Sequence, residues 1–424
     1  MNKNHPSTKT PDVIEQAVEL EIVRTIQAGF PTYTSFLSQY TKEPDLSFEV
    51  RKRRPNMFDA ITPQINAASG KILESDIIIT SPAFQELATN IDLQGTPLKA
   101  FAEEMVKDAL WAGHNIIFID HTRPSTVAKT RRDELIAGAR PFWRMIKKDN
   151  IRNIQTEIIN GKLCVSQMTI QEDITEPDGF GANVITQWRV LRRRAEGATF
   201  TIYRTGSTNN GVVISTEETL FQGANKKALR EIPVVMVPTR PTGFFTSKPY
   251  FMELATLVRM DYLIASDMDH NHFMTSYPLL VTSGEDFVEG ANKNTLIGPN
   301  ARLKLGDGGD AKYISGDGRG VELGMQRLKQ LREQMVVSGL RLSMETTSAD
   351  RETAEAKLLV ANVDDVRLSM ISEHIQSALN QAITITGQYM NTDLGTLTLP
   401  FSFVRQTEKI QGPETKATLG PEAE

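Results

Sequence analysis

The longest stretches free of helix-breaking residues lie in the second half of the chain. Residues 251–277 contain neither glycine nor proline, and proline is absent from residue 301 to residue 399. At about 1.5 Å per residue, a helix over 251–277 spans about 40 Å, and one over 321–387 approaches about 100 Å. Helices in globular proteins average about a dozen residues. The pattern therefore predicts two rods, separated by a small glycine-rich β insert over residues 279–318.

The second rod is predicted to break once. Apolar residues repeat at spacings of three and four and define one stripe: Val321, Met325, Leu328, Leu331 (or Arg332), Met335 and Leu342. The polar run 345–352 then interrupts that stripe. Ser348 can serve as a new helix N-cap, and Asp350 and Glu352 would lie in the first turn that follows. We therefore expect a helix over 319–343, a polar break over 344–352 and a third helix over 353–388.

The third helix has apolar residues on two faces. One face carries Leu368, Ile371, Ile375, Leu379 and Ala382, and the other carries Leu359, Val363 and Val366. A helix that is apolar on more than one side is normally buried by other elements. The pattern predicts a central helix.

The first half of the chain alternates helices and strands. Residues 1–12 are polar and are expected to form a flexible arm. An amphipathic helix is predicted over 98–111, ended by Gly113 and followed at once by a buried strand over 115–120. From 150 to 237 the apolar period becomes two, with turn residues at Asn160-Gly161 and Pro177-Asp178-Gly179, which predicts an antiparallel meander. The whole region 13–248 is expected to be an α/β body.

Composition changes this picture only slightly. The chain has 424 residues and a net charge of −5, which argues against a protein that grips phosphate backbones. The basic cluster 51–54 is interpreted as a solvated or subunit-facing patch. Cys164 is the sole cysteine and fits a half-buried strand position. No signal sequence and no membrane-spanning apolar run is present, so assembly in the cytoplasm is expected.

Candidate chemistry is sparse. Asp267, Asp269, His270 and His272 could be offered as metal ligands, but on a helix they point in different directions. The turn Asp307-Gly308-Gly309-Asp310 lacks the regular oxygen ligands of a calcium loop. No nucleotide-binding or hydrolase motif is present. We therefore predict no catalytic residues, no metal and no cofactor, and an enzyme has no positive support.

The order of the parts resembles a known family. The segments that carry the resemblance are Ile91-Asp92-Leu93-Gln94-Gly95, residues 110–120, Arg140-Pro141-Phe142-Trp143, Trp188-Arg189-Val190-Leu191, Ile232-Pro233-Val234-Val235, residues 260–267 and Pro278-Leu279-Leu280-Val281. Together with the β insert, the second helix, the polar break and the third helix, this order resembles the portal (head-to-tail connector) proteins of tailed bacteriophages. The resemblance covers roughly residues 60–388. Each segment by itself is a loosely defined pattern, and the resemblance consists in the order in which these patterns occur.

The resemblance implies an α+β portal-type fold. An α/β wing at 13–248 would contain the β-meander of 150–237. The stem would consist of helices at 249–278 and 319–343, and the small β-rich clip would lie between them at 279–318. A tunnel loop at 344–352 and a long spine helix at 353–388 would follow. Residues 389–424 would form a short strand and a tail, with the crown small or absent.

The resemblance also implies a function. Family members form a homo-oligomeric ring, typically of twelve subunits, at one vertex of the capsid, through which double-stranded DNA is packaged and ejected. Expected partners are further copies of the chain, the terminase large subunit, a head-completion or tail adaptor protein, and the major capsid and scaffolding proteins, with no membrane. The protein would belong to the virion and be assembled in the host cytoplasm.

The implied site residues fall into three sets. The tunnel loop facing DNA would comprise Glu345, Thr346, Thr347, Ser348, Asp350, Arg351 and Glu352. The stem set comprises Arg259, Asp261, Asp267, Arg327, Lys329 and Arg332. The clip, which would dock the terminase and the adaptor, comprises Glu285, Asp286, Lys293, Asn300, Arg302, Lys304 and Asp307. A channel wall of mixed charge would hold no phosphate tightly, which suits DNA that must slide.

Two other functions remain open at this stage. A phage structural adaptor or scaffolding component without a DNA channel would also be rich in long helices and poor in catalytic motifs. An enzyme would require a pocket with convergent titratable groups, which the sequence does not reveal.

Overall fold

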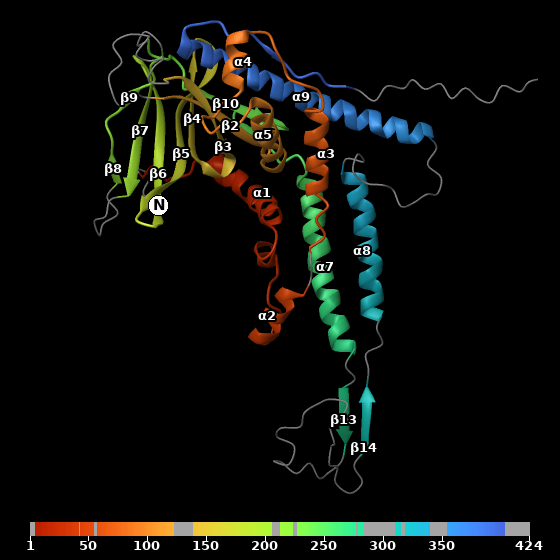
Figure 1. Cartoon of the computed structure of the whole chain (residues 1–424). Helices are drawn as coiled ribbons and strands as arrows, with labels where there is room; N and C mark the ends of the chain where they lie inside the picture. The colour runs from red at the N-terminus through yellow and green to blue at the C-terminus, as the bar shows by residue number, and fades with distance from the viewer. Residues whose placement is uncertain are drawn as a thin grey trace, which may run out of the picture. The chain divides into compact units, whose positions relative to one another are not determined.

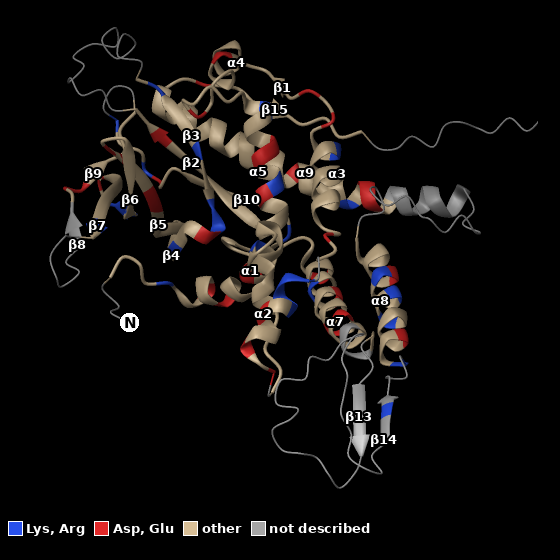
Figure 2. Ribbon diagram, turned by 60° about the horizontal axis from the view of Figure 1, so that its bottom comes forward, with Lys and Arg blue, Asp and Glu red and all other residues tan. Residues whose placement is uncertain are grey.

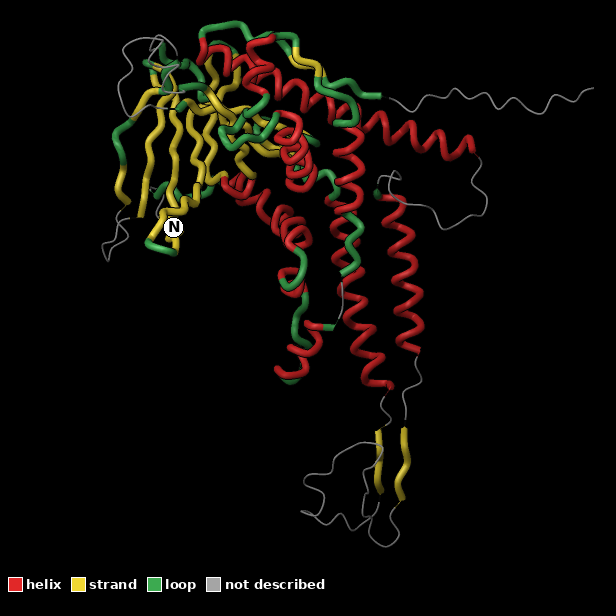
Figure 3. The backbone as a smooth tube through the Cα atoms, in the orientation of Figure 1, coloured by secondary structure: helices red, strands yellow, loops and turns green. Residues whose placement is uncertain are grey.

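The computed structural model describes residues 5–41, 43–54, 57–122, 139–205, 213–223, 227–276, 279–283, 310–314, 319–339 and 354–402. The chain divides into two compact units. Unit 1 comprises Met1–Arg24, Thr62–Met252 and Leu340–Glu424, and unit 2 comprises Thr25–Ile61 and Glu253–Gly339. Helices and strands both contribute extensively (Figures 1 and 3), which confirms the predicted α+β class.

A three-stranded antiparallel sheet forms the centre of unit 1. Its strands are β10 (Val234–Pro238), β2 (His114–His121) and β3 (Pro141–Lys147), in the order β10-β2-β3. Helix α5 (Leu98–Ala112) leads directly into β2 through Gly113, as the sequence predicted. Gly113 has a φ of 92°, and a Cβ there would come within 2.6 Å of the Lys248 carbonyl carbon. Only glycine allows both the turn and this close backbone approach.

The predicted meander is a second, six-stranded sheet. It consists of β4 (Ile151–Ile159), β5 (Lys162–Asp178), β6 (Gly181–Arg194), β7 (Gly197–Thr205) and β8 (Val213–Ser215), with β9 (Thr219–Leu220) paired to β7. The turns fall at Asn160-Gly161 and at Gly179, where positive φ values are observed. The strands β5 and β6 run further than the apolar alternation indicated, because cross-strand pairing continues from Gln167↔Arg192 to Asp178↔Gly181.

Charged side chains join the two sheets. Arg189 on β6 donates to Glu172 on β5 at 3.0 Å and to Asp120 on β2 at 3.1 Å. Arg144 on β3 donates to the same Glu172 oxygen at 2.9 Å. Burial raises the pKa of Glu172, but the two arginines and Gln187 outweigh it and hold the pKa below its ordinary value. Because every member has a partner, this half-buried network stabilises the contact between the sheets.

The long helix α9 (Ala354–Met390) packs against the three-stranded sheet. Its predicted apolar face is buried: Leu368, Ile371, Ile375, Leu379 and Ala382 are at most 2% exposed. Trp143 Nε1 donates to Thr386 Oγ1 at 2.8 Å, and the Tyr389 hydroxyl donates to the Ile119 carbonyl at 3.2 Å. These contacts hold the C-terminal part of α9 on strands β2 and β3.

The expectation that α9 is buried on a second face is wrong. Val363 and Val366 are 46% and 53% exposed, and Met370 is 56% exposed. The sheet covers one side of the helix, and no described element of unit 1 covers the other at these positions. Leu359, the third residue of that predicted face, lies outside the residues whose side chains are described.

Short elements complete unit 1. Helix α1 (Pro11–Ala28) begins in this unit and ends just before Gly29. Residues 5–10 of the predicted flexible arm contact the meander, where the His5 ring packs edge-on against Trp188. The remaining elements are α3 (Thr62–Ile72), β1 (Ile78–Ile79), α4 (Pro82–Ala88), η2 (Lys148–Asn150), β11 (Pro241–Gly243), β12 (Thr246–Ser247) and β15 (Leu397–Thr398). The predicted C-terminal strand, β15, pairs antiparallel with β1.

Unit 2 is built on two antiparallel helices. These are α7 (Met252–Ser276) and α8 (Arg319–Ser338). Between them the chain forms the antiparallel pair β13 (Leu279–Ser283) and β14 (Asp310–Ile314), with register from Leu279↔Ile314 to Ser283↔Asp310. The 3-10 helix η1 (Thr32–Phe36) and helix α2 (Asp45–Arg53) belong to the same unit. Among the described residues, no helix is long and apolar enough to cross a bilayer.

Truncation of Trp143 tests the packing of α9 on the sheet. Trp143 is fully buried, and its ring packs against Phe84 and Phe101. We expect Trp143→Ala to lower the free energy of unfolding by about 3–5 kcal/mol, because it leaves a cavity and removes the bond to Thr386. Phe180→Ala is the matched control, since Phe180 is fully exposed at a hairpin turn, and it should change stability by less than about 0.5 kcal/mol. Urea denaturation followed by circular dichroism measures both; equal losses would contradict this account.

Candidate functional site

All six predicted stem residues lie on α7 and α8 of unit 2. These two helices come directly before and after the β13–β14 hairpin in the chain, as the tube in Figure 3 shows. We treat the pair and the segment 25–61 that packs on it as the candidate functional site. The predicted tunnel-loop residues and clip residues, within 344–352 and 285–307, lie outside the described residues.

One charged pair joins the two helices. Asp261 of α7 is buried, with its side chain 2% exposed, and its Oδ1 accepts a bond from Arg332 Nε of α8 at 3.2 Å. The Arg332 side chain is 51% exposed, and its guanidinium carbon lies 5.2 Å from the centre of the Phe58 ring. Loss of Arg332 would leave a buried carboxylate unpaired, which is more costly than losing an exposed ion pair. The structure thus brings two of the predicted stem residues together in a structural contact.

A close approach of the helices lies two turns further along. A Cβ built on Gly324 of α8 would clash with Cγ and Sδ of Met268 on α7. The glycine therefore makes room for the methionine side chain at this crossing. After Met268, α7 continues toward the hairpin. The contact between Gly324 and Met268 therefore sets how closely the two helices approach each other at their hairpin end.

The apolar stripe of α8 differs from the predicted one at its beginning. Leu328, Leu331 and Met335 are buried, as predicted, whereas Met325 is 59% exposed. The position one turn before Leu328 that faces α7 is Gly324, which hydropathy cannot identify as an interface residue. The expectation for Met325 is therefore wrong, because a glycine takes the place of an apolar side chain in the stripe.

Of the other four predicted stem residues, two contact the segment 25–61 and two lie on the exposed surface of α8. The Asp267 carboxylate accepts a bond from the Tyr40 hydroxyl. Arg259 is half-buried with its guanidinium carbon 5.2 Å from the centre of the Phe36 ring. Arg327 and Lys329 are exposed. Within the described part of the chain, no group of three His, Cys, Asp or Glu side chains is placed to hold a metal ion.

Helix α2 is held by the buried Arg51, which bonds to Glu43 just before the helix and, through Nη1, to Ser266 Oγ of α7 at 3.4 Å. Arg51 and Glu43 form a two-point contact, Nε–Oε1 at 3.0 Å and Nη2–Oε2 at 2.9 Å, with both side chains only 4% exposed. Arg51 also donates to the Ser38 carbonyl, and its guanidinium carbon lies 3.9 Å above the centre of the Tyr40 ring. The hydrogen bonds from Arg51 lower the pKa of Glu43. The interpretation of residues 51–54 as a solvated patch is therefore wrong for Arg51.

An aromatic contact supports the same packing. Tyr33 and Tyr262 meet edge to face at a ring-centre distance of 5.0 Å, and Leu37 packs with them. Burial raises the pKa of Tyr262 to about 12. Tyr262 on α7 is thus held from the side opposite the exposed surface of the helix, and the segment 25–61 acts as a brace for α7.

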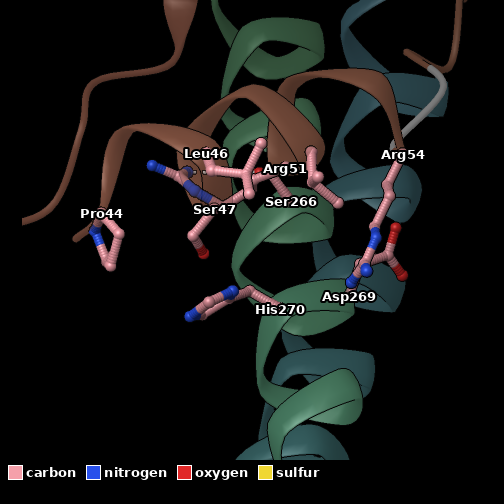
Figure 4. A pocket seen from close by; sticks show the side chains of 9 residues that line it. Pro44, Leu46, Ser47, Arg51, Arg54, Ser266, Asp269 and His270 are labelled. Atoms are coloured by element: carbon pink, nitrogen blue, oxygen red, sulfur yellow. Dashed lines mark hydrogen bonds between the residues drawn. The ribbon is translucent and has the colours of Figure 1, made fainter.

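The brace leaves a small pocket beside α7. It has a volume of ≈ 410 Å³ and is bounded by α2 and by Ser266, Asp269 and His270 of α7 (Figure 4). The guanidinium of Arg51 at its edge is already engaged by Glu43 and Ser38. The pocket therefore follows from the packing of the brace.

Two buried bases in unit 1 were weighed as an alternative site. Burial and the nearby charge of Lys148 lower the pKa of His114 to about 3, and burial lowers that of Lys148 to about 8. Shifted pKa values of this kind can mark active sites. Here Lys148 Nζ donates to the carbonyl oxygens of Ala112 at 3.1 Å and of Ser247 at 2.9 Å. The pair therefore ties the end of α5 to strand β12, which is a structural role.

Sequence reasoning missed the residues of the brace. Tyr40, Glu43 and Arg51 lie in a region with little periodic apolar pattern, and Glu43 and Arg51 are eight residues apart across a turn. No local signal distinguishes the buried Arg51 from its exposed neighbours Arg53 and Arg54. Only the position of α7 decides which arginine is covered.

One family model matches the part of the chain that contains the helix pair. A family model described as "Domain of unknown function (DUF4055)" matches residues 250–390, which include α7, the hairpin, α8 and α9. No curated protein sequence matches the chain.

Three solved structures are similar in fold at low sequence identity. A chain of "Virion of native gene transfer agent (GTA) particle" has a TM-score of 0.42 and 10% identity, covering 91% of this chain and 90% of that one. Chains of "Neck of empty GTA particle computed with C6 symmetry" and "Neck of native GTA particle computed with C12 symmetry" have TM-scores of 0.40 and 0.39 and identities of 11% and 8%, each covering 80% of both chains.

Two glycines of α8 test the helix contact. Gly320 has open space around its Cα, whereas Gly324 faces Met268. We expect Gly320→Ala to raise the free energy of unfolding by about 1 kcal/mol, because alanine favours the helix. Gly324→Ala should lower it, because the methyl group displaces Met268. In a Met268→Ala background the added methyl group has room. Gly324→Ala should there raise the free energy of unfolding relative to Met268→Ala alone, because alanine favours the helix. Thermal or urea unfolding measures all four variants, and a stabilising Gly324→Ala would contradict the proposed fit.

Truncation of Arg51 tests the brace. Arg51→Ala should destabilise unit 2 by about 2 kcal/mol, because charged hydrogen bonds are lost and Glu43 is left covered and unpaired. Lys52→Ala is the control, since Lys52 only pairs with Glu49 on the surface, and its effect should stay below about 0.5 kcal/mol. Hydrogen exchange of peptides from α2 and α7 should be faster in Arg51→Ala alone. Unchanged exchange would show that the pair does not hold α2.

Proposed function

We propose that this chain is the subunit of a portal, the ring-shaped head-to-tail connector of a tailed phage-like particle. In this proposal unit 1 corresponds to the wing and spine, and α7 and α8 are the two stem helices. The β13–β14 hairpin belongs to the clip, and residues 344–352 form the loop that faces DNA. The protein acts as a channel and a docking platform, not as an enzyme.

A single structural observation carries the proposal. The chain leaves an α/β body through one long helix, forms an antiparallel hairpin, and returns through a second helix that packs antiparallel on the first. A 37-residue helix then follows and packs on the body. This is the order stem, clip, stem, spine that the sequence resemblance implied, now supported by strand pairing and helix contacts.

The charge of the helix pair supports a channel role. Lys329 of α8 and Asp269 of α7 are exposed, so the exposed surface of the helix pair carries both signs. Such a surface forms no continuous set of phosphate contacts, and each such contact would add to the affinity for DNA. A wall of this kind suits a duplex that must move past it in both directions.

The proposal includes the assembly and its partners. A ring of twelve copies would occupy one capsid vertex among the major capsid and scaffolding proteins. The clip would bind the terminase large subunit during packaging and the head-completion or tail adaptor afterwards. Assembly would take place in the host cytoplasm, and the finished protein would belong to the virion.

Electron microscopy of the purified full chain in negative stain tests the proposal. We expect closed rings with an axial hole, because in this proposal copies of the chain alone form the channel. A persistent monomer, or an open assembly without a hole, would instead favour a structural adaptor or scaffolding component. Arg51→Ala protein, imaged in parallel, should show whether weakening the brace reduces the fraction of closed rings.

A further inference from the structure

Exposed side chains on α7 and α8 form two rows at seven-residue spacing. The row on α8 consists of Leu323, Gln330 and Val337, and the row on α7 consists of Glu253, Met260 and Asp267. Leu323, Val337 and Met260 are 66%, 71% and 41% exposed. Residues seven apart drift by only about 20° around a helix. Each row therefore forms a nearly straight line, with apolar residues that the described part of unit 2 leaves uncovered.

The α8 row lies away from α7. Successive residues turn by about 100°, so Gln330 lies on the side of α8 opposite the buried Leu328 and Leu331. The two rows of one chain therefore face different directions and cannot cover each other. Among the described residues nothing covers the apolar members of either row, and a second molecule could bury them.

Charge on the two helices is complementary. The exposed charged residues of α7 are all acidic: Glu253, Asp267 and Asp269. Those of α8 are mainly basic: Arg319, Arg327, Lys329 and Arg332, against Glu322 and Glu333. Figure 2 marks the Lys and Arg positions of α8 in blue along the ribbon, with Asp and Glu positions in red between them. Opposite net charges of the exposed residues on the two helices fit a head-to-tail contact between copies.

Residues of the two rows also lie at matching heights along the helix axes. Asp261 lies opposite Arg332 and Met268 lies opposite Gly324, so each step along α7 corresponds to one step back along α8. Met260 is therefore level with Glu333, midway between Gln330 and Val337. Asp267 is level with Met325, about 3 Å along the axis from Arg327. A copy placed beside the first without a shift along the helices brings Met260 between two row residues and Asp267 next to Arg327.

We propose that the α8 row of one copy packs on the α7 row of a second copy, with Met260 between Gln330 and Val337 and with Asp267 paired to Arg327. The interface joins two different surfaces, the α8 row of one copy and the α7 row of the next. Every copy therefore contacts two neighbours, and repetition of this contact by rotation closes a ring. This inference rests on the proposed ring and identifies which helix faces hold it together.

A charge exchange tests the predicted pair in the full-length protein. Arg327→Glu places a carboxylate beside Asp267, and Asp267→Lys places an amine beside Arg327. Each single variant should raise the protein concentration needed for half-maximal assembly by about tenfold or more, because like charges meet across the interface. The double variant should return this concentration to near the wild-type value. Analytical ultracentrifugation over a dilution series measures it.

Two control variants separate the interface from other effects. Lys329→Glu makes the same charge change on an exposed position of α8 outside the row, and it should assemble like the wild type. Tyr40→Phe removes the bond that Asp267 accepts while keeping the Asp267 carboxylate, so any assembly defect it causes measures the loss of that bond alone. If Arg327→Glu assembles as well as Lys329→Glu, or if the double variant shows no recovery, the proposed pairing is wrong.

Disulfide cross-linking gives an independent readout. In a Cys164→Ser background, Met260→Cys combined with Gln330→Cys should give a ladder of covalent multimers on oxidation, because each copy bonds to the next. Met260→Cys alone should give none beyond a dimer. Failure of the wild type to form any closed assembly would overturn the proposed function together with this inference. Closed rings without a ladder and without a charge-exchange effect would overturn the interface alone.

Discussion

The contact between α7 and α8 is the constraint on which unit 2 depends. Two antiparallel helices joined through a hairpin have little core of their own, so their relative position rests on a few contacts. The bond between Asp261 and Arg332 fixes one level, and the glycine at 324 lets Met268 pack at another. These two contacts fix the position along the helix axis of every exposed side chain on α7 and α8. They therefore also fix the geometry of any contact between these helices and another molecule.

The segment 25–61 holds α7 from another side. Its Arg51–Glu43 pair and its Tyr33–Tyr262 contact are both covered by chain. Forming such a charged pair costs free energy, because both groups must leave water. Removing only one partner costs more, because the other charge stays buried without its partner. The pair therefore ties α2 to the residues that precede it, and the bond from Arg51 to Ser266 links α2 to α7.

Unit 1 is stabilised in a different way. Its core lies between α5, α9 and the β10-β2-β3 sheet, where Trp143, Phe118 and the apolar face of α9 are fully buried. The meander is joined to this core through the network centred on Glu172 and Arg189. The two units thus rest on different interactions: dense apolar burial in one, and a small number of specific polar and close contacts in the other. The exposed apolar rows on the helix pair belong to the unit with the smaller core.

The sequence by itself determined the class and order of the elements. Periodicity placed α7, α8 and α9, the turn residues Asn160-Gly161 placed the meander hairpin, and Gly113 placed the junction of α5 with β2, because these signals act within a few residues. Only the tertiary structure decided which side chains are covered. Arg51 is buried because α7 lies beside it, Val363 and Val366 are exposed because only one side of α9 meets the sheet, and Gly324 replaces Met325 in the contact because closeness depends on the partner helix. Burial at these positions depends on elements that come from elsewhere in the chain, which the local pattern does not record.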